Sequence, residues 1–251
     1  MTKILKGGPV RKAYMRELED RRRALPRAPK LLILSDGEPD SEVYRRSIER
    51  LAHRLNVELV SALHECDGLI QLGRPQIEDV PPEKDVEGIS EYHIGRLAYG
   101  RPLYLPPTPA AALKLLKFYG YPLRGVDVVV IGRSVRVGKP LALMLLNEDA
   151  TPTVAHTKTA DLQRITREAK IVFLSAGVGN RFGREYFSPE SVVVDIATVS
   201  FNGGIVGDAR YDELLDYVEA ITPVPGGVGK ITPLVLFDNL FRAVERSGET
   251  P

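Results

Sequence analysis

The sequence predicts an α/β protein with a parallel β-sheet covered by helices on both faces, and two patterns support this. Short apolar runs rich in valine and isoleucine alternate with helix-like patterns through the second half of the chain. One such run, residues 126–131, ends in a glycine turn, and a helix pattern opens at Pro140 soon after it. Repeated strand–helix units of this length place successive strands parallel in one sheet. A chain of 251 residues is long enough for two modest domains or one large one.

The first half of the chain contains helix and strand patterns that end in a proline-rich loop. Ser41 is a candidate N-cap for a helix. That helix carries an apolar stripe at three- and four-residue spacing, formed by Val43, Tyr44, Ile48, Leu51 and Leu55. The other expected elements are a helix at 10–24, strands at 31–35, 57–60 and 68–72, and a loop from Gly73 to Pro82.

The second half begins with a helix pattern at 108–119, which we expect to link two domains. The elements expected after it are strands at 126–131, 153–156, 171–175 and 192–196, and helices at 140–147, 162–169 and 233–246. No internal repeat or low-complexity tract interrupts this order.

Bulk composition indicates a soluble globular protein, with 43% hydrophobic and 27% charged residues. The net charge of +1 gives no overall field that favours nucleic acid or a membrane surface. The single cysteine, Cys66, excludes an internal disulfide and a cysteine-rich metal site, and we expect it to pack as a small buried residue. We predict no metal site. No apolar stretch approaches the roughly 20 residues that span a bilayer, and no signal-peptide core is present, so the expected location is the cytoplasm.

The glycine turn after the strand at 126–131 is the most informative functional signal. Gly132 and Gly138 bracket it, and the helix that follows would present backbone N–H groups and the positive end of its dipole to an anion. Such a unit typically holds the phosphates of a nucleotide. The two glycines are six residues apart, so the G-x-G-x-x-G fingerprint is not matched, and a plain glycine turn is the alternative.

The residues around this turn favour NADP over NAD. Arg133 could pair with an extra phosphate through two parallel hydrogen bonds. The next strand ends in His156, Thr157 and Lys158, with no carboxylate for a ribose 2′-hydroxyl. His156 itself is left without a role. The turn from Ser175 to Gly179, which includes Gly177, would bring backbone close to the cofactor, or is simply a glycine-rich turn.

Motifs along nearly the whole chain resemble those of the methylenetetrahydrofolate dehydrogenase/cyclohydrolase family. The cofactor-side match is Gly132-Arg133-Ser134-x-x-Val137-Gly138-x-Pro140, followed by Ala150-Thr151 and His156-Thr157-Lys158-Thr159. Residues 223–229 resemble the family's P-V-P-G-G-V-G signature, residues 84–88 its K-D-V-D-G, and Gln71-Leu72 its V-Q-L-P. Ser41-x-x-Tyr44 resembles the start of its S-x-x-Y-x-x-x-K helix. Several long motifs in the same order argue against a chance resemblance.

The resemblance implies two domains with the active-site cleft between them, and a homodimer. Residues 1–118 plus 230–251 would form the folate-substrate domain, and 119–229 a Rossmann-type dinucleotide-binding domain. The dehydrogenase passes a hydride from 5,10-methylenetetrahydrofolate to NADP, and the cyclohydrolase opens the methenyl product to 10-formyltetrahydrofolate. The candidate catalytic and substrate residues are Tyr44, Gln71 and Glu87, with Pro225, Gly226 and Gly227 also at the substrate, and the candidate cofactor residues are Gly132, Arg133, Ser134, Val137, Gly138, Thr157 and Gly177.

The sequence departs from this family mainly around the substrate. Ile48 stands where the family has its catalytic lysine, and the i, i+4 spacing predicts that it faces the cleft beside Tyr44. Isoleucine can neither transfer a proton nor orient water. Glu87 replaces an aspartate, and Lys230 stands where a proline is usual. The family's Q-L-P-L-P becomes Gln71-Leu72-Gly73-Arg74-Pro75, and Pro107-Thr108-Pro109-Ala110-Ala111 lacks the usual glycine after its T-P pair.

These departures predict an NADP-dependent methylenetetrahydrofolate dehydrogenase of one-carbon metabolism in which cyclohydrolase activity is weak or absent. Hydride transfer needs mainly aligned reactants, whereas hydrolysis needs an activated water. Two alternatives are a bifunctional enzyme with a changed water geometry and a non-catalytic NADP-binding paralogue. The pterin is either tetrahydrofolate or a modified form such as tetrahydromethanopterin.

Overall fold

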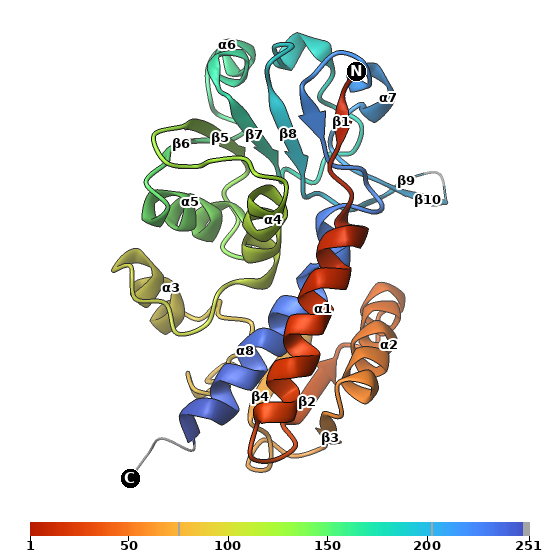
Figure 1. Ribbon diagram of the computed structural model, residues 1–251, viewed down its shortest axis with the longest axis vertical. Coiled ribbons are helices and arrows are strands. Elements are labelled where there is room, and N and C mark those ends of the chain that lie inside the picture. The colour runs from red at the N-terminus through yellow and green to blue at the C-terminus, as the bar shows by residue number, and fades with distance from the viewer. Residues whose placement is uncertain (75, 202, 248–251) are drawn as a thin grey trace. The chain divides into compact units, whose positions relative to one another are not determined.

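The computed structural model describes residues 1–74, 76–201 and 203–247. These residues form two compact α/β units, which confirms the predicted fold class (Figure 1). Unit 1 comprises Met1–Arg11 and Thr108–Thr232, and unit 2 comprises Lys12–Pro107 and the chain from Pro233 onward. Residues 1–11, 108–118 and 230–232 group with unit 1, whereas the predicted boundaries placed them in the substrate domain. Pro75, in the predicted loop, lies outside the described residues.

The sheet of unit 1 has six strands in the order β1-β11-β8-β7-β5-β6, all parallel, as predicted. The strands are β1 (Lys3–Ile4), β5 (Asp127–Ile131), β6 (Thr151–Ala155), β7 (Ile171–Leu174), β8 (Val192–Asp195) and β11 (Ala220–Ile221). Because Lys3 pairs with Ala220, the N-terminal segment is held in this sheet. β6 is an edge strand and begins two residues earlier than predicted.

Both faces of this sheet are buried, as a parallel sheet requires. Val129, Val172 and Val193 point to one face and pack in a single apolar cluster. Val130 and Phe173, which alternate with them, point to the other face and are fully buried as well. The near-continuous runs of valine and isoleucine in the sequence follow from this burial on both sides.

Helices and short segments connect these strands. They are α4 (Pro107–Phe118), α5 (Gly138–Asn147), α6 (Leu162–Glu168), α7 (Tyr211–Leu214), the 3₁₀ turns η1 (Arg184–Tyr186) and η2 (Val228–Lys230), and the antiparallel hairpin of β9 (Val199–Phe201) and β10 (Gly204–Val206). α5 follows β5 and packs on β5 and β6. The sequence predicted α4, α5 and α6, but neither the hairpin nor the short segments β1, β11 and α7.

Unit 2 contains a smaller parallel sheet in the order β3-β2-β4. Its elements are β2 (Lys30–Ser35), β3 (Glu58–Val60), β4 (Gly68–Leu72), α2 (Pro39–Arg54), α3 (Glu91–Ala98), and parts of α1 (Gly7–Ala24) and α8 (Thr232–Ser247). α1 and α8 are tied together where the Arg21 guanidinium pairs with Asp238 and Glu245. Cys66 is buried, as predicted, and its thiol lies 3.3 Å from the carbonyl oxygen of Leu63. In the described parts of the chain, no helix is long and apolar enough to cross a membrane.

The start of α2 corrects one prediction. Ser41 is not the N-cap, because the helix begins at Pro39 and Glu38 occupies the capping position. Proline suits the first helical turn, since its fixed φ is helical and its missing N–H would have no partner there. The Ser41 hydroxyl instead hydrogen-bonds the carboxylate of Asp36, which helps to lower the pKa of that carboxyl group.

Candidate functional site

The end of β5 and the start of α5 approach so closely that only glycine fits at two positions. Gly132 has φ +133°, and a Cβ there would lie 2.5 Å from the Ser175 carbonyl oxygen. A Cβ on Gly138 would lie 2.1 Å from the Gly132 carbonyl oxygen. The glycines six residues apart therefore allow the strand end to touch the helix start. This close approach is what a phosphate-binding turn needs.

Polar groups of this turn are ordered around the N-terminus of α5. The hydroxyl oxygen of Ser134 accepts a hydrogen bond from the Val137 N–H at 3.1 Å, and the Lys139 N–H donates to the Ser134 carbonyl oxygen at 3.0 Å. Arg133 and Ser134 are exposed at the carboxyl end of the strand. The arrangement offers a guanidinium and a helix N-terminus to an anion.

The end of β6 lies beside this turn. Ile131 pairs with Ala155, so Arg133 and Thr157 both lie two residues beyond paired positions. Thr157 and Lys158 are exposed, and no carboxylate occurs between Thr151 and Thr159. An NADP 2′-phosphate is compatible with this set of side chains, whereas a free ribose 2′-hydroxyl would find no carboxylate there.

His156, to which the sequence assigned no role, shapes this turn. Its Nδ1 accepts a hydrogen bond from the Lys158 N–H at 3.1 Å, which places the ring proton of the neutral form on Nε2. Its own N–H donates to the Thr159 hydroxyl oxygen at 2.9 Å. The histidine thus fixes the backbone that carries Thr157 and Lys158.

The loop after β7 is organised by a residue that sequence reasoning missed. The carboxylate of Asp208 accepts backbone N–H groups from four successive residues, Ala176, Gly177, Val178 and Gly179, at 2.6 to 3.0 Å. Asp208 is fully buried. The N–H of the predicted cofactor residue Gly177 is therefore already engaged within the protein.

A second buried carboxylate, Asp195, ends β8. Its oxygens accept the N–H groups of Ala197 at 3.1 Å and Ala209 at 2.8 Å. Burial, reinforced by the neighbouring charge of Asp208, raises the pKa of Asp195 to about 7, although the hydrogen bonds that it accepts oppose this shift. A polar residue directly after three buried valines was the sequence signal that could have identified it.

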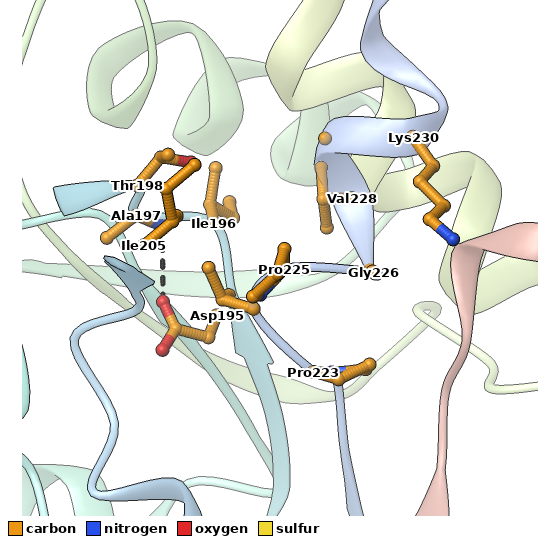
Figure 2. Close-up of a pocket in the computed structure, with 13 residues that line it drawn as sticks. Asp195, Ile196, Ala197, Thr198, Ile205, Pro223, Pro225, Gly226, Val228 and Lys230 are labelled. Carbon is orange, nitrogen blue, oxygen red and sulfur yellow. Dashed lines mark hydrogen bonds between the residues drawn. The ribbon is translucent and has the colours of Figure 1, made fainter. Parts of the chain in front are cut away.

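Asp195 lies in the wall of a cavity of about 250 Å³ in unit 1. Figure 2 shows Asp195 on one side of Pro225 and the Lys230 ammonium on the other. The lining residues come from the end of β8, the hairpin and the segment after β11: Asp195, Ile196, Ala197, Thr198, Ile205 and Pro223 to Lys230. The predicted substrate residues Pro225, Gly226 and Gly227 thus line a pocket at the carboxyl edge of the nucleotide-type sheet.

Near the end of β4, Glu87 interacts with two other predicted residues of unit 2, Gln71 and Tyr44. The Gln71 N–H donates to a carboxylate oxygen of Glu87 at 3.0 Å. Burial raises the pKa of the Tyr44 phenol well above its usual range, and the nearby charge of Glu87 adds to this shift. Tyr44 therefore stays a neutral hydroxyl beside an acidic side chain.

The side-chain amide of Gln71 is used within the protein. Its Oε1 accepts the N–H groups of Gln76 and Ile77, each at 2.8 Å, and its Nε2 donates to the Ile77 carbonyl oxygen at 2.9 Å. The amide fixes the loop after β4. The side chain of Gln71 therefore holds the backbone of residues 76 and 77 in place.

Ile48 differs from its predicted surroundings. It lies one turn after Tyr44 on α2, but its side chain has an exposed fraction of 0%, so it faces no open space. Leu51 and Ala52 of the same helix are buried with it. Isoleucine suits this buried position because its side chain is apolar, whereas the buried ammonium of a lysine would need a polar partner.

The Gly73 departure has a steric cause. Gly73 has φ +77°, which proline cannot adopt, and a Cβ there would lie 1.8 Å from a carboxylate oxygen of Asp36. The same carboxylate accepts the Arg74 N–H at 3.0 Å. Asp36 and Gly73 are thus a matched pair that ties the loops after β2 and β4.

Comparison with known proteins gives a consistent assignment. Residues 106–248 match the family described as tetrahydrofolate dehydrogenase/cyclohydrolase, NAD(P)-binding domain. The chain is 37% identical to the bifunctional protein FolD of Dictyoglomus thermophilum over 277 residues, which cover 97% of this chain and 98% of the relative.

Two solved structures share the whole fold. The bifunctional 5,10-methylenetetrahydrofolate dehydrogenase/cyclohydrolase of Thermoplasma acidophilum has a TM-score of 0.91 and 31% identity, covering 99% of this chain and 100% of its own. The Trypanosoma brucei enzyme, complexed with NADP and an inhibitor, has a TM-score of 0.90 and 29% identity, covering 99% of each chain. The chain therefore belongs to the tetrahydrofolate dehydrogenase/cyclohydrolase family and carries that family's NAD(P)-binding domain.

Proposed function

We propose that this protein is an NADP-dependent 5,10-methylenetetrahydrofolate dehydrogenase whose cyclohydrolase activity is weak or absent. The observation that carries this proposal is Ile48, a fully buried apolar side chain at the family's lysine position. Membership of the family supports the dehydrogenase reaction and its place in one-carbon metabolism. The loss of the second activity is an inference from the chemistry of the side chains that are present.

The nucleotide residues of unit 1 suit NADP. The glycine contacts at 132 and 138 let a pyrophosphate approach the N-terminus of α5. Arg133 and Thr157 supply a cation and a hydroxyl for a 2′-phosphate. NADP, when bound, supplies the nicotinamide C4 that accepts the hydride. The Trypanosoma brucei relative was solved with this cofactor.

The residues of unit 2 suit a folate-type substrate. Glu87, held on β4 by the Gln71 N–H, offers carboxylate oxygens to the N–H donors of a pterin. Tyr44 offers a neutral hydroxyl that can donate a hydrogen bond. These groups bind and orient a substrate, which is what hydride transfer asks of a protein.

Hydrolysis of the methenyl compound needs catalytic groups that hydride transfer does not. A water must be activated and the departing nitrogen must receive a proton. Ile48 offers neither a proton nor a lone pair. Arg45, on the same helix, pairs with Glu49 at 2.9 Å, and a guanidinium is too weak a base to activate water. The Tyr44 phenol, with its raised pKa, is likewise protonated at neutral pH.

The test follows the two reactions separately. Purified enzyme is mixed with 5,10-methylenetetrahydrofolate and NADP to record NADPH formation, and with the methenyl compound to record its decay above the rate in buffer. We expect NADPH formation with little enzyme-dependent methenyl decay. Rapid methenyl decay catalysed by the wild-type protein would contradict the proposal.

Two substitutions sharpen this test. A lysine can bury its methylene groups where Ile48 packs and extend its ammonium toward Tyr44, one turn away, so Ile48→Lys should raise cyclohydrolase activity by about tenfold or more. Ile48→Met is the matched control, since it keeps an apolar side chain of similar volume and should leave both rates within about twofold. Equal methenyl decay in both variants would remove Ile48 as the explanation.

Two alternatives have distinct outcomes. A bifunctional enzyme would use Tyr44 and Glu87 to organise water, and would show fast methenyl decay in the wild type. A non-catalytic paralogue would bind NADP but no folate analogue. The presence of Tyr44, Gln71 and Glu87, with Gln71 bonded to Glu87 and the charge of Glu87 acting on Tyr44, argues against the paralogue. Calorimetric titration with NADP and with a folate analogue separates these cases.

We also propose that the protein is a homodimer. β6 is an edge strand of the six-stranded sheet, and its outer residues Thr151, Thr153 and Val154 are exposed. An edge strand with an open row of backbone hydrogen-bonding groups is a template for pairing with a second chain. β6 has five residues, whereas β1 at the other edge of the same sheet has two.

A further inference from the structure

The loop after β7 carries a backbone nest that is filled by a side chain of the protein itself. Four successive N–H groups, those of residues 176–179, converge on the two carboxylate oxygens of Asp208 at 2.7, 2.9, 2.6 and 3.0 Å. Nests of this kind commonly hold phosphate or another anion. Here the anion is internal, fully buried and covalently part of the chain.

Asp208 is itself held firmly in this position. Its carbonyl oxygen accepts the N–H groups of Arg181 at 2.8 Å and Phe182 at 3.0 Å. The next residue, Ala209, donates its N–H to Asp195 at 2.8 Å. The carboxylate thus ties the loop at 176–179 to a segment that is itself hydrogen-bonded to residues 181–182 and to Asp195.

The nest determines which hydrogen-bonding groups the loop at 176–179 can offer to a ligand. Because the four N–H groups donate to Asp208, the polar main-chain groups that residues 176–179 still offer are carbonyl oxygens, which only accept hydrogen bonds. A phosphate, which also only accepts, has no favourable partner on this loop. A ligand group that donates, such as a hydroxyl or an amide NH₂, does.

The place of β7 in the sheet identifies that ligand group. β7 lies between β5, whose glycine turn suits a pyrophosphate, and β8, which ends in the cavity of Figure 2. From β6 to β8 the sheet spans about 14 Å, three strand spacings. A dinucleotide whose adenosine 2′-phosphate lies at Arg133 and Thr157 therefore crosses the end of β7 with its nicotinamide riboside half. The donors of that half are the ribose hydroxyls and the carboxamide NH₂.

We propose that Asp208 is a positioning residue for the nicotinamide riboside half of the cofactor. Its carboxylate turns four N–H groups inward, so that the loop at 176–179 presents acceptors to the hydroxyl and amide donors of the ligand. This inference rests on the proposed binding of NADP. The inference adds to that proposal a role for Asp208, a residue that would touch no cofactor atom.

The experiment compares whole cofactor with its adenosine end alone. Wild type, Asp208→Asn and Asp208→Ala are titrated calorimetrically with NADP and with 2′,5′-ADP, which lacks the nicotinamide riboside. We expect both variants to bind NADP about tenfold or more weakly, and 2′,5′-ADP within about twofold of wild type. Asp149→Asn is the matched control. Asp149 is exposed and pairs with Arg124 at 3.0 Å. It precedes the amino end of β6, away from the carboxyl ends of the strands where the ligand is proposed to bind. Its variant should therefore bind both ligands as wild type does.

A rescue measurement separates positioning from general loss of structure. In Asp208→Ala, added formate can fill the nest and should restore a large part of the NADP affinity, whereas an equal concentration of chloride should not. If Asp208→Ala does not fold, the Asp208→Asn titrations decide the question. Unchanged NADP affinity, or an equal loss for 2′,5′-ADP, would overturn the inference. Failure of the wild-type protein to bind NADP would instead overturn the proposed function.

Discussion

At the residue scale, Asp195 links burial to protonation. It is the one ionisable residue in a strand that otherwise consists of buried valines, with an exposed fraction of 2%. Burial is the largest cause that raises the pKa of this carboxyl group from 3.8 to about 7. The folded protein therefore keeps a proton on Asp195 at pH values where the unfolded chain has released it.

This difference predicts how stability depends on pH. A raised carboxyl pKa stabilises the folded state fully below pH 4, and that contribution is lost as pH rises to about 7. The loss amounts to about 4 kcal/mol in the free energy of unfolding, from the size of the pKa difference. Asp195→Asn removes the titrating group, so its stability should fall less between pH 4.5 and 7.5 than that of wild type, by roughly that amount.

Urea denaturation at these two pH values measures the effect. Asp149→Asn, which changes an exposed carboxylate in the same unit, serves as the control and should keep the wild-type pH dependence. Parallel pH profiles for wild type and Asp195→Asn would show that Asp195 is not the group responsible.

At the residue scale, too, several predicted roles changed once partners were visible. The Gln71 N–H bonds Glu87 and the charge of Glu87 acts on the Tyr44 phenol, but the side-chain amide of Gln71 hydrogen-bonds the loop at 76–77. Ile48 was expected to face a cleft and is instead buried. Spacing along a helix gives a direction for a side chain, whereas the neighbours that cover it come from distant parts of the sequence.

At the scale of elements, the unit formed by β5, its glycine turn and α5 depends on two close backbone contacts. A methyl group on Gly138 would lie 2.1 Å from the Gly132 carbonyl oxygen, and the three nearest atoms are all backbone atoms of Gly132 and Arg133, which cannot rotate away as a side chain could. Gly138→Ala must therefore shift α5 away from β5. We expect NADP to bind at least about tenfold more weakly, because the helix N–H groups would no longer reach the phosphates.

Gly95→Ala is the matched control for this prediction. Gly95 lies within α3, and a Cβ there meets nothing within 4 Å. Alanine at a free helical position should raise stability by about 0.5–1 kcal/mol and leave cofactor affinity unchanged. Fluorescence titration with NADPH and thermal denaturation of both variants check the pair. Wild-type affinity in Gly138→Ala would show that the contact is not needed for binding.

Elements with strong periodicity were predicted from the sequence, and short ones were not. β5, β7, β8, α4 and α8 follow from local runs of apolar residues. β1 and β11 have two residues each, and they form strands through pairing with distant segments: Lys3 of β1 pairs with Ala220, and Ala220 of β11 also pairs with Val192 of β8. No local pattern can encode such a pairing. The start of α2 was misplaced because Pro39 suits a first helical turn better than Ser41 suits a cap.

At the scale of the whole molecule, the exposed edge at β6 predicts the oligomeric state. The chain has a mass of 27.7 kDa, and we expect light scattering after gel filtration to give about twice this value. Val154→Asp places a charge on the edge strand and should shift the protein toward the monomer, because a buried unpaired carboxylate opposes association.

Leu59→Asp is the control for this prediction. Leu59 is also exposed on an edge strand, β3, but that strand has only three residues. This variant should remain dimeric. A monomeric wild type would contradict the dimer proposal, and a monomer only in Leu59→Asp would move the interface to β3.

The sequence by itself determined the α/β class, the parallel strand–helix repeat, the glycine turn at 132–138 and the family. These depend on local periodicity, on the missing side chain of glycine and on motifs that keep their order. Only the tertiary structure decided where Asp208 and Asp195 place their carboxylates, how the Gln71 amide is used, and that Ile48 is buried. Each of these depends on hydrogen bonds or packing between segments far apart in the chain, and such contacts leave no periodic trace in the sequence.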